Sequence, residues 1–220
     1  MKKMMLLAGI LCVAIVAVAA VHSYFSPASG SEPAKPPARP AGTDTWVTVQ
    51  DVKVQGRSVT DEALGVSVVL PSDWELLSAI RRGRNETSLA FVSSQLPSAT
   101  ITAYFRNGPR AATAANGSPE DLLREAVRFK TKQRIADGYA NYAIAAEPVT
   151  TSIGEHPGMA WSATYSAGGT PWTEVLTRVQ MADYSVLFFL MVPSASAEAA
   201  KPALEQVLRS AVLPKESTVR

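Results

Sequence analysis

The segment "VLFFLMV", Val186–Val192, consists of seven consecutive apolar residues. A strand with one face in water alternates apolar and polar side chains, and this segment does not, so both of its faces must be covered. Burying these side chains stabilises the fold by roughly 10–20 kcal/mol before conformational entropy is subtracted. Leaving one face of the strand in water would forfeit a large part of this stabilisation. The chain must therefore place structure above and below this strand.

Two predicted helices can supply these layers. The first spans Ser118–Gly138, where a capping serine, a proline, acidic residues and a closing glycine follow in order. Its predicted inner side contains Leu122, Leu123, Ala126, Val127 and Phe129. Its predicted outer side contains Arg124, Arg128, Lys132 and Arg134. The second helix runs from about Ala197 to Val212, where Pro202 indicates a late start or a kink.

Alternating apolar and polar residues, bounded by turn residues, predict the strands. They fall at Trp46–Gln55, Gly65–Leu70, Thr87–Ser93, Ala99–Phe105, Ala143–Ile153, Met159–Tyr165, Thr173–Met181 and Ser185–Val192. Short connections favour antiparallel neighbours. The simplest arrangement is an α+β fold in which a single antiparallel sheet has helices on both faces. This domain is expected to span residues 46–214, followed by a tail at 215–220.

The pattern of residues 1–25 predicts one of two structures, either an apolar helix that anchors the chain in a membrane or a signal peptide that is cleaved. Lys2 and Lys3 precede the uncharged run Met4–Val21, whose 18 residues would measure about 27 Å as a helix. The small residues Ala19 and Ala20 also fit a signal cleavage site. Either alternative carries the following residues across a membrane, so the folded domain is expected to be extracytoplasmic.

Residues 26–45 predict a disordered, proline-rich linker. Five prolines lie between Pro27 and Pro40, and no apolar periodicity accompanies them. In an extended polyproline conformation this stretch reaches on the order of 50 Å. A spacer of that reach is useful when its far end is fixed, which favours the anchor over the signal peptide.

The composition excludes several classes of function. The first 42 residues carry four basic residues and one acidic residue, Glu32. The remainder holds 17 basic and 18 acidic side chains. A folded part with so little net charge is not an electrostatic nucleic-acid binder. Cys12 is the only cysteine, and His22 and His156 are the only histidines. These counts argue against thiolate or multi-histidine metal sites and against Ser-His-Asp or Cys-His catalysis. We therefore expect no nucleic-acid partner, no metal, no cofactor and no enzymatic activity.

The order of the elements resembles the PsbP-like superfamily over roughly Leu64–Leu213. The likeness is carried by "GVSVVLPSDW", "SIGEHPGMAWSATY", "VLTRVQMADYSVLFFLMVP" and the helix end "VLRSAVL". The bacterial envelope members, of the DcrB kind, are nearest, because the basic N-terminus and the proline-rich spacer are typical of bacterial export. The resemblance implies an α/β/α sandwich in which Trp74, shortly after Pro71, packs on the core beside a helix. It implies no activity, because function belongs to sites and not to folds.

Two sets of residues are candidates for binding. Arg81, Arg82 and Arg84 could bind an anionic headgroup or an acidic partner, although they also fit a solvated hairpin tip. Trp161 and Trp172 could line a groove or a partner surface, although aromatic residues more often pack in the core.

The sequence thus predicts a non-enzymatic extracytoplasmic domain that binds a protein partner in the cell envelope or assists assembly at the membrane surface, where the N-terminal helix attaches it. One alternative is a small-ligand carrier or hydrolase with a cleft between sheet and helix, which requires a deep pocket with convergent polar groups. Another is a photosystem II-associated relative of PsbP.

Overall fold

The structure, a computed structural model, describes residues 46–48, 51–82, 86–107, 119–154, 156–180 and 184–213. The predicted anchor or signal peptide, the linker and the tail lie outside these residues. No helix in the described part of the chain is long and apolar enough to cross a membrane.

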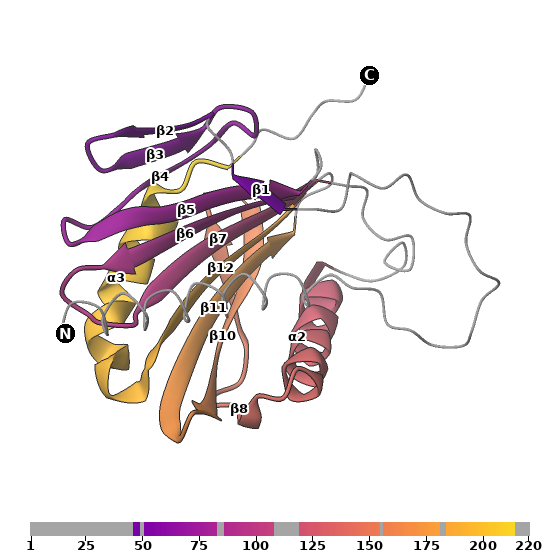
Figure 1. Ribbon diagram of the computed structural model, residues 1–220. Helices are drawn as coiled ribbons and strands as arrows, with labels where there is room; N and C mark the ends of the chain where they lie inside the picture. The colour runs from indigo at the N-terminus through magenta and orange to yellow at the C-terminus, as the bar shows by residue number, and fades with distance from the viewer. Residues whose placement is uncertain are drawn as a thin grey trace, which may run out of the picture.

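A nine-stranded antiparallel sheet forms the centre of the domain (Figure 1). Its strands lie in the order β1 (Trp46–Thr48), β5 (Trp74–Arg82), β6 (Glu86–Ser93), β7 (Thr100–Asn107), β12 (Tyr184–Pro193), β11 (Thr170–Gln180), β10 (His156–Ala167) and β8 (Ala140–Ile144). The ninth strand, β9 (Val149–Ile153), also pairs with β10. The predicted hairpin strands at Thr87–Ser93 and Ala99–Phe105 are confirmed as β6 and β7.

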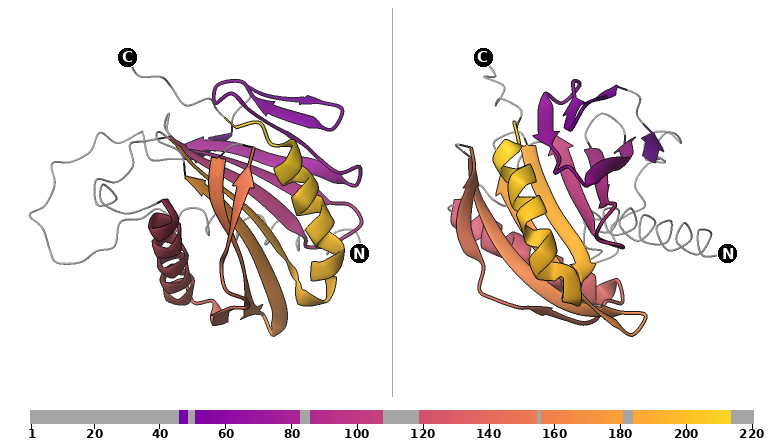
Figure 2. Two further views of the ribbon diagram at one scale, coloured as in Figure 1. Left: turned by 180° about the vertical axis from the view of Figure 1, so that it is seen from behind. Right: turned by 90° about the vertical axis from the view of Figure 1, so that its left-hand side faces the viewer.

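The segment Val186–Val192 lies in β12, between β7 and β11, and none of its side chains is more than 3% exposed. Every second residue from Val186 to Val192 packs in one core with α3 (Ala197–Ser210). The intervening residues Leu187, Phe189 and Met191 pack in a second core with Val127 of α2 (Pro119–Ala136). We call these two sides of the sheet the α3 face and the α2 face (Figure 2). The prediction that both faces of this strand are covered is confirmed.

The prediction of a single sheet is wrong. The strands β2 (Val52–Gln55), β3 (Ser58–Asp61) and β4 (Val66–Val69) form a separate three-stranded sheet, so the predicted strand Trp46–Gln55 divides between two sheets. Eight strands lie side by side across the large sheet, because β8 and β9 share one edge of β10. At about 4.8 Å apart they span roughly 34 Å, and one helix about 10 Å wide cannot cover that width. The small sheet completes the cover of the α3 face, alongside α3 (Figures 1 and 2).

Hydrogen bonds join the small sheet to the end of α3. Ser67 donates its amide to the carbonyl of Val212 at 3.1 Å, and the amide of Val212 donates to the carbonyl of Ser67 at 2.8 Å. The amide of Val69 donates to the hydroxyl of Ser210 at 2.9 Å. The small sheet and α3 therefore cover the α3 face as one layer.

The predicted start of the last helix at Ala197 is confirmed, so the late start, one of the two alternatives at Pro202, does not occur. The helix α3 begins at Ala197, directly after the short 3-10 helix η2 (Ser194–Ser196), and contains Pro202. Proline has no amide hydrogen, so one carbonyl of the preceding turn of α3 lacks its helical hydrogen bond. Pro202 is exposed, so this carbonyl lies on the solvent side of the helix. The buried side of α3 contributes Ala200, Leu204 and Val207 to the core that also holds Trp74, which confirms that Trp74 packs on the core.

The predicted strand Ala143–Ile153 is two strands. β8 pairs with one half of the outer edge of β10 and β9 with the other half. The amide of Ala145 still donates to the carbonyl of Ser162 in β10 at 2.9 Å, and Ala146–Pro148 then leaves the sheet, where Pro148 has no amide to donate to a ladder. This break lies beside α2 and forms one wall of the groove described below.

Candidate functional site

The side of α2 that faces the sheet carries two positive charges. α2 contacts β8, β10 and β11, and its buried residues include Val127, Lys130 and Arg134, at a spacing that places them on one side of the helix. Phe129, predicted on the inner side, is 38% exposed, and Arg134, predicted on the outer side, is fully buried. The predicted orientation of α2 is therefore wrong at both positions.

Glu174 of β11 is the counterion of this side of α2. Arg134 donates from Nη2 to Oε1 of Glu174 in an ion pair whose side chains are both fully buried. Arg134 also donates from Nη1 to the hydroxyl of Tyr139 at 3.0 Å, and Tyr142 donates its hydroxyl to Oε2 of Glu174 at 3.0 Å. Burial alone would raise the pKa of Glu174, but the charges of Arg134 and Lys130 outweigh it and hold the pKa below its ordinary value.

Lys130 adds a second cation to the same interior. Burial, reinforced by the neighbouring charge of Arg134, lowers the pKa of Lys130 to about 7. Its ammonium group lies 5.7 Å from the centre of the Phe189 ring on β12. The cluster of Lys130, Arg134 and Glu174 is therefore electrically neutral when Lys130 is deprotonated and carries a net positive charge when it is protonated.

Aromatic rings close the cluster at the C-terminal end of α2. The rings of Tyr139 and Tyr165 lie 4.8 Å apart edge-on, and Tyr165 stacks on Trp172 at 6.3 Å. Trp161 is 4% exposed in the core of the α2 face, and Trp172 packs against the same core while partly exposed. The structure thus brings the two predicted tryptophans to one face of the sheet, where both are packing residues.

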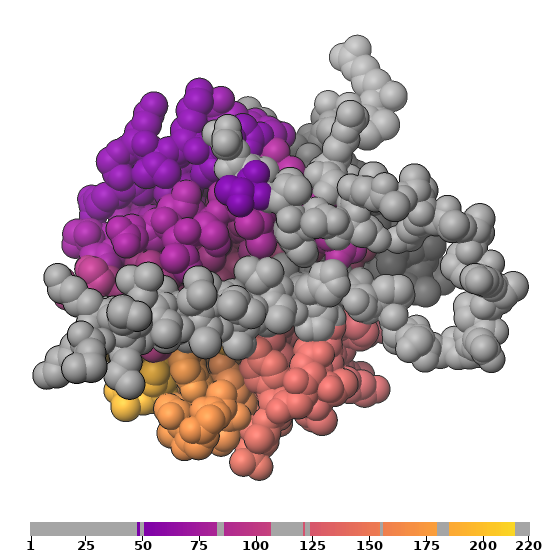
Figure 3. All heavy atoms as spheres, in the orientation of Figure 1, coloured from indigo at the N-terminus to yellow at the C-terminus, as the bar shows by residue number. Residues whose placement is uncertain are grey.

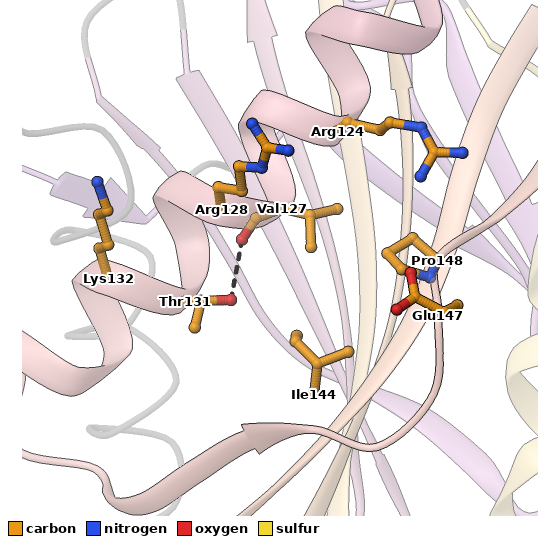
Figure 4. A pocket seen from close by; sticks show the side chains of 8 residues that line it. All are labelled: Arg124, Val127, Arg128, Thr131, Lys132, Ile144, Glu147 and Pro148. Atoms are coloured by element: carbon orange, nitrogen blue, oxygen red, sulfur yellow. Dashed lines mark hydrogen bonds between the residues drawn. The ribbon is translucent and has the colours of Figure 1, made fainter.

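A groove of about 430 Å³ lies between α2 and the break in the sheet edge (Figure 4). Its lining residues are Arg124, Val127, Arg128, Thr131, Lys132, Ile144, Glu147 and Pro148. The hydroxyl of Thr131 donates to the carbonyl of Val127 at 3.0 Å, which leaves its methyl group to the groove. The floor formed by Val127, Thr131, Ile144 and Pro148 is therefore largely apolar.

The two rims of the groove carry opposite charges. Arg124, Arg128 and Lys132 follow one another at every fourth position along α2, and Glu147 stands on the opposite rim (Figure 4). Arg128 and Lys132 are exposed, and neither makes an ion pair with any residue that the structure describes. In the space-filling view, atoms of α2 lie at the surface of the molecule (Figure 3). This rim is accessible to a ligand.

The predicted arginine set is divided by the structure. Arg81 and Arg82 are neighbours in β5 and so point to opposite faces of the sheet. On the α3 face, Arg81 pairs with Asp61 at 2.7 Å and with Asp51 at 2.8 Å. On the α2 face, Arg82 pairs with Glu86 at 3.4 Å. Arg84 lies outside the described residues, and anion binding by this set stays a prediction.

Replacing Arg81 with methionine should lower the free energy of unfolding by about 1–2 kcal/mol, because it leaves the carboxylate of Asp61 buried without its cation. Urea unfolding followed by tryptophan fluorescence would measure the change. Arg57, an exposed residue between β2 and β3, provides the matched control, and Arg57→Met should change stability by less than about 0.5 kcal/mol. Equal effects of the two substitutions would show that Arg81 does not join the small sheet to β5.

No protein-family model matches the chain, and no curated protein matches its sequence. Several solved structures are similar to it at low identity. A crystal structure from Bacteroides thetaiotaomicron has 17% identity and a TM-score of 0.46, over 74% of this chain and 50% of that one. The chain thus spans half the length of that protein.

Two further structures match more of their own length. LpqN of Mycobacterium tuberculosis, which is involved in cell envelope biogenesis, has 13% identity and a TM-score of 0.43, over 68% of this chain and 83% of its own. The cyanobacterial PsbP (CyanoP) of Synechocystis sp. PCC 6803 has 12% identity and a TM-score of 0.46, over 80% of this chain and 97% of its own. A PsbP protein is thus among the structures to which this chain is similar.

Proposed function

We propose that this chain is a non-enzymatic binding domain that acts outside the cytoplasm and takes a protein partner in the groove between α2 and the β8–β9 edge. The observation that carries the proposal is the combination of an apolar floor with two exposed cations, Arg128 and Lys132, that make no ion pair with described residues. A surface that is both concave and incompletely neutralised is typical of an interaction site.

Exposed apolar residues extend the surface beyond the groove itself. Ile135 lies two turns beyond Arg128 on the same side of α2, and it is 57% exposed. Val149 follows Pro148 on the opposite wall and is 59% exposed. The apolar area thus continues past both walls, which suits a partner larger than a small molecule.

The position of the buried cluster of Lys130, Arg134 and Glu174 supports a non-enzymatic role for these three residues. Acid–base catalysis requires such groups within hydrogen-bond reach of a substrate. Lys130, Arg134 and Glu174 are at most 2% exposed, and none of them lines the groove. The ion pair between Arg134 and Glu174 joins α2 to β11.

The form of the groove favours a protein partner over the small-ligand alternative. A carrier of small molecules encloses its ligand and fixes it with convergent polar groups. This groove is open along one side, and its charged groups stand on the rims above an apolar floor (Figure 4). The proposal of an extracytoplasmic position rests on the basic residues and the apolar run of residues 1–25, and fractionation of the host cell with N-terminal sequencing tests it.

Photocrosslinking in the host cell tests the proposed partner. A photoreactive amino acid at Ile144, in the wall of the groove, should give one reproducible crosslinked protein. The same amino acid at Gln55, an exposed position at the end of β2, provides the control and should not give that product. Arg128→Glu with Lys132→Glu should reduce the Ile144 product at least about threefold, because the rim charge is reversed. A product that is identical from both positions, or insensitive to the charge reversal, would contradict this function.

A further inference from the structure

We propose that the groove binds an extended segment of the partner in which acidic and apolar residues alternate. This inference rests on the proposed function and adds the chemistry and the conformation of the ligand. It follows from the spacing of the cations on α2 and the separation of the charged rims of the groove from its apolar floor.

The cations are spaced for a strand. Arg124, Arg128 and Lys132 are four residues apart, which places them about 6 Å apart along the helix axis. In an extended chain, every second side chain points to the same side, and such side chains are about 6.6 Å apart. A strand parallel to α2 can therefore present one carboxylate to Arg128 and the next carboxylate on the same side to Lys132.

The same alternation accounts for the floor. When the carboxylates of a strand point to the rim, the intervening side chains point to the opposite side. In the groove this side is occupied by Val127, Ile144 and Pro148, all of them apolar. Apolar residues at the intervening positions would be buried there, and each methylene group removed from water adds to the affinity.

The shape of the groove and its second rim favour a peptide over an anionic membrane. A flat lipid surface could contact Arg128 and Lys132 but could not fill the apolar floor between the walls. Glu147, on the rim opposite the cations, would repel lipid phosphates, whereas a peptide can offer it a backbone or side-chain donor.

The test uses the full chain in a mild non-ionic detergent and a fluorescein-labelled peptide that alternates glutamate with valine. Fluorescence anisotropy should show binding that weakens as the salt concentration rises, because exposed charges carry part of the affinity. Arg128→Glu with Lys132→Glu should weaken binding about tenfold or more, since two attractive contacts become repulsive. The matched control, Arg57→Glu with Arg209→Glu, makes the same change in net charge at exposed positions away from the groove and should leave binding unchanged.

Three further probes separate the alternatives. A block peptide of the same composition, with all glutamates before all valines, should bind at least about tenfold more weakly, because one strand face cannot then carry all the carboxylates. Equal or tighter binding of the block peptide, or of a helix-forming peptide with glutamate at every fourth position, would overturn the extended conformation. Groove-dependent binding to phosphatidylglycerol vesicles without binding of the peptide would identify a membrane surface and overturn the inference.

The outcomes also distinguish this inference from the proposed function. If the Ile144 crosslink is formed and depends on Arg128 and Lys132 while the alternating peptide does not bind, the proposed function stands and the inference fails. If neither the crosslink nor the peptide depends on these residues, both fail.

Discussion

Replacing Glu174 with glutamine should lower the free energy of unfolding by about 3–5 kcal/mol. The substitution leaves the guanidinium of Arg134 in a fully buried position without a carboxylate, beside Lys130. Removal of one partner of a buried ion pair is costly because the remaining charge has neither water nor a counterion. Urea unfolding followed by tryptophan fluorescence measures the loss.

Two further variants give this result its interpretation. Glu205→Gln removes an exposed partner of Arg209 and should change stability by less than about 0.5 kcal/mol. The double variant Arg134→Met with Glu174→Leu should recover most of the loss, because apolar residues of similar volume need no counterion. A double variant as unstable as Glu174→Gln alone would show that packing, and not charge, determines the effect.

Replacing Lys130 with methionine should raise the free energy of unfolding at pH 7 by roughly 2–4 kcal/mol and should remove a pH dependence of the unaltered protein. The pKa of Lys130 falls from an ordinary 10.5 to about 7 in the folded state, because burial and Arg134 disfavour its charge. Between these two values the unfolded chain holds one more proton than the folded chain. The stability of the unaltered protein therefore rises with pH from about 7 to about 9.5, by up to about 1.4 kcal/mol per pH unit.

Unfolding curves at pH 6, 7, 8 and 9 measure both effects. Below the folded-state pKa, Lys130 is protonated in both the folded and the unfolded chain. The cost of its buried charge is then fully present, and the free energy of unfolding no longer changes with pH because of Lys130. The tyrosines whose pKa values are raised in the folded state, Tyr139 among them, act above about pH 10 and do not affect this range. Lys132→Met, an exposed neighbour on α2, is the control and should keep the pH dependence. A Lys130→Met variant that keeps the same slope would contradict the assignment.

Much of the layer structure could be predicted from the sequence. The uninterrupted apolar run of β12 required cover on both faces, and local sequence signals predicted the helix α2 and the turn between β6 and β7. These features depend on residues within a few positions of one another, which is the range over which sequence patterns are informative.

The position of the charged cluster could not be predicted in the same way. Lys130 and Arg134 interrupt the apolar pattern of α2, so a hydrophobic criterion places Arg134 in water and Phe129 inside. Their burial is tolerable because Glu174, forty positions further along the chain from Arg134, supplies the opposite charge. One signal was present in the sequence. Glu174 shares a strand face with Trp172 and Leu176, and a carboxylate between an aromatic and an aliphatic residue of a core-facing strand requires a cation.

The sequence by itself determined the number of covered faces, the two helices and the type of most strands, because burial of apolar area and local capping depend on composition and short-range order. Only the tertiary structure decided which side of α2 faces the sheet, that Arg81 and Arg82 pair on opposite faces, and that Arg128 and Lys132 stand beside an apolar floor. The physical reason is that charge pairing and concavity arise between segments distant in the chain, and no local pattern records which of them will meet.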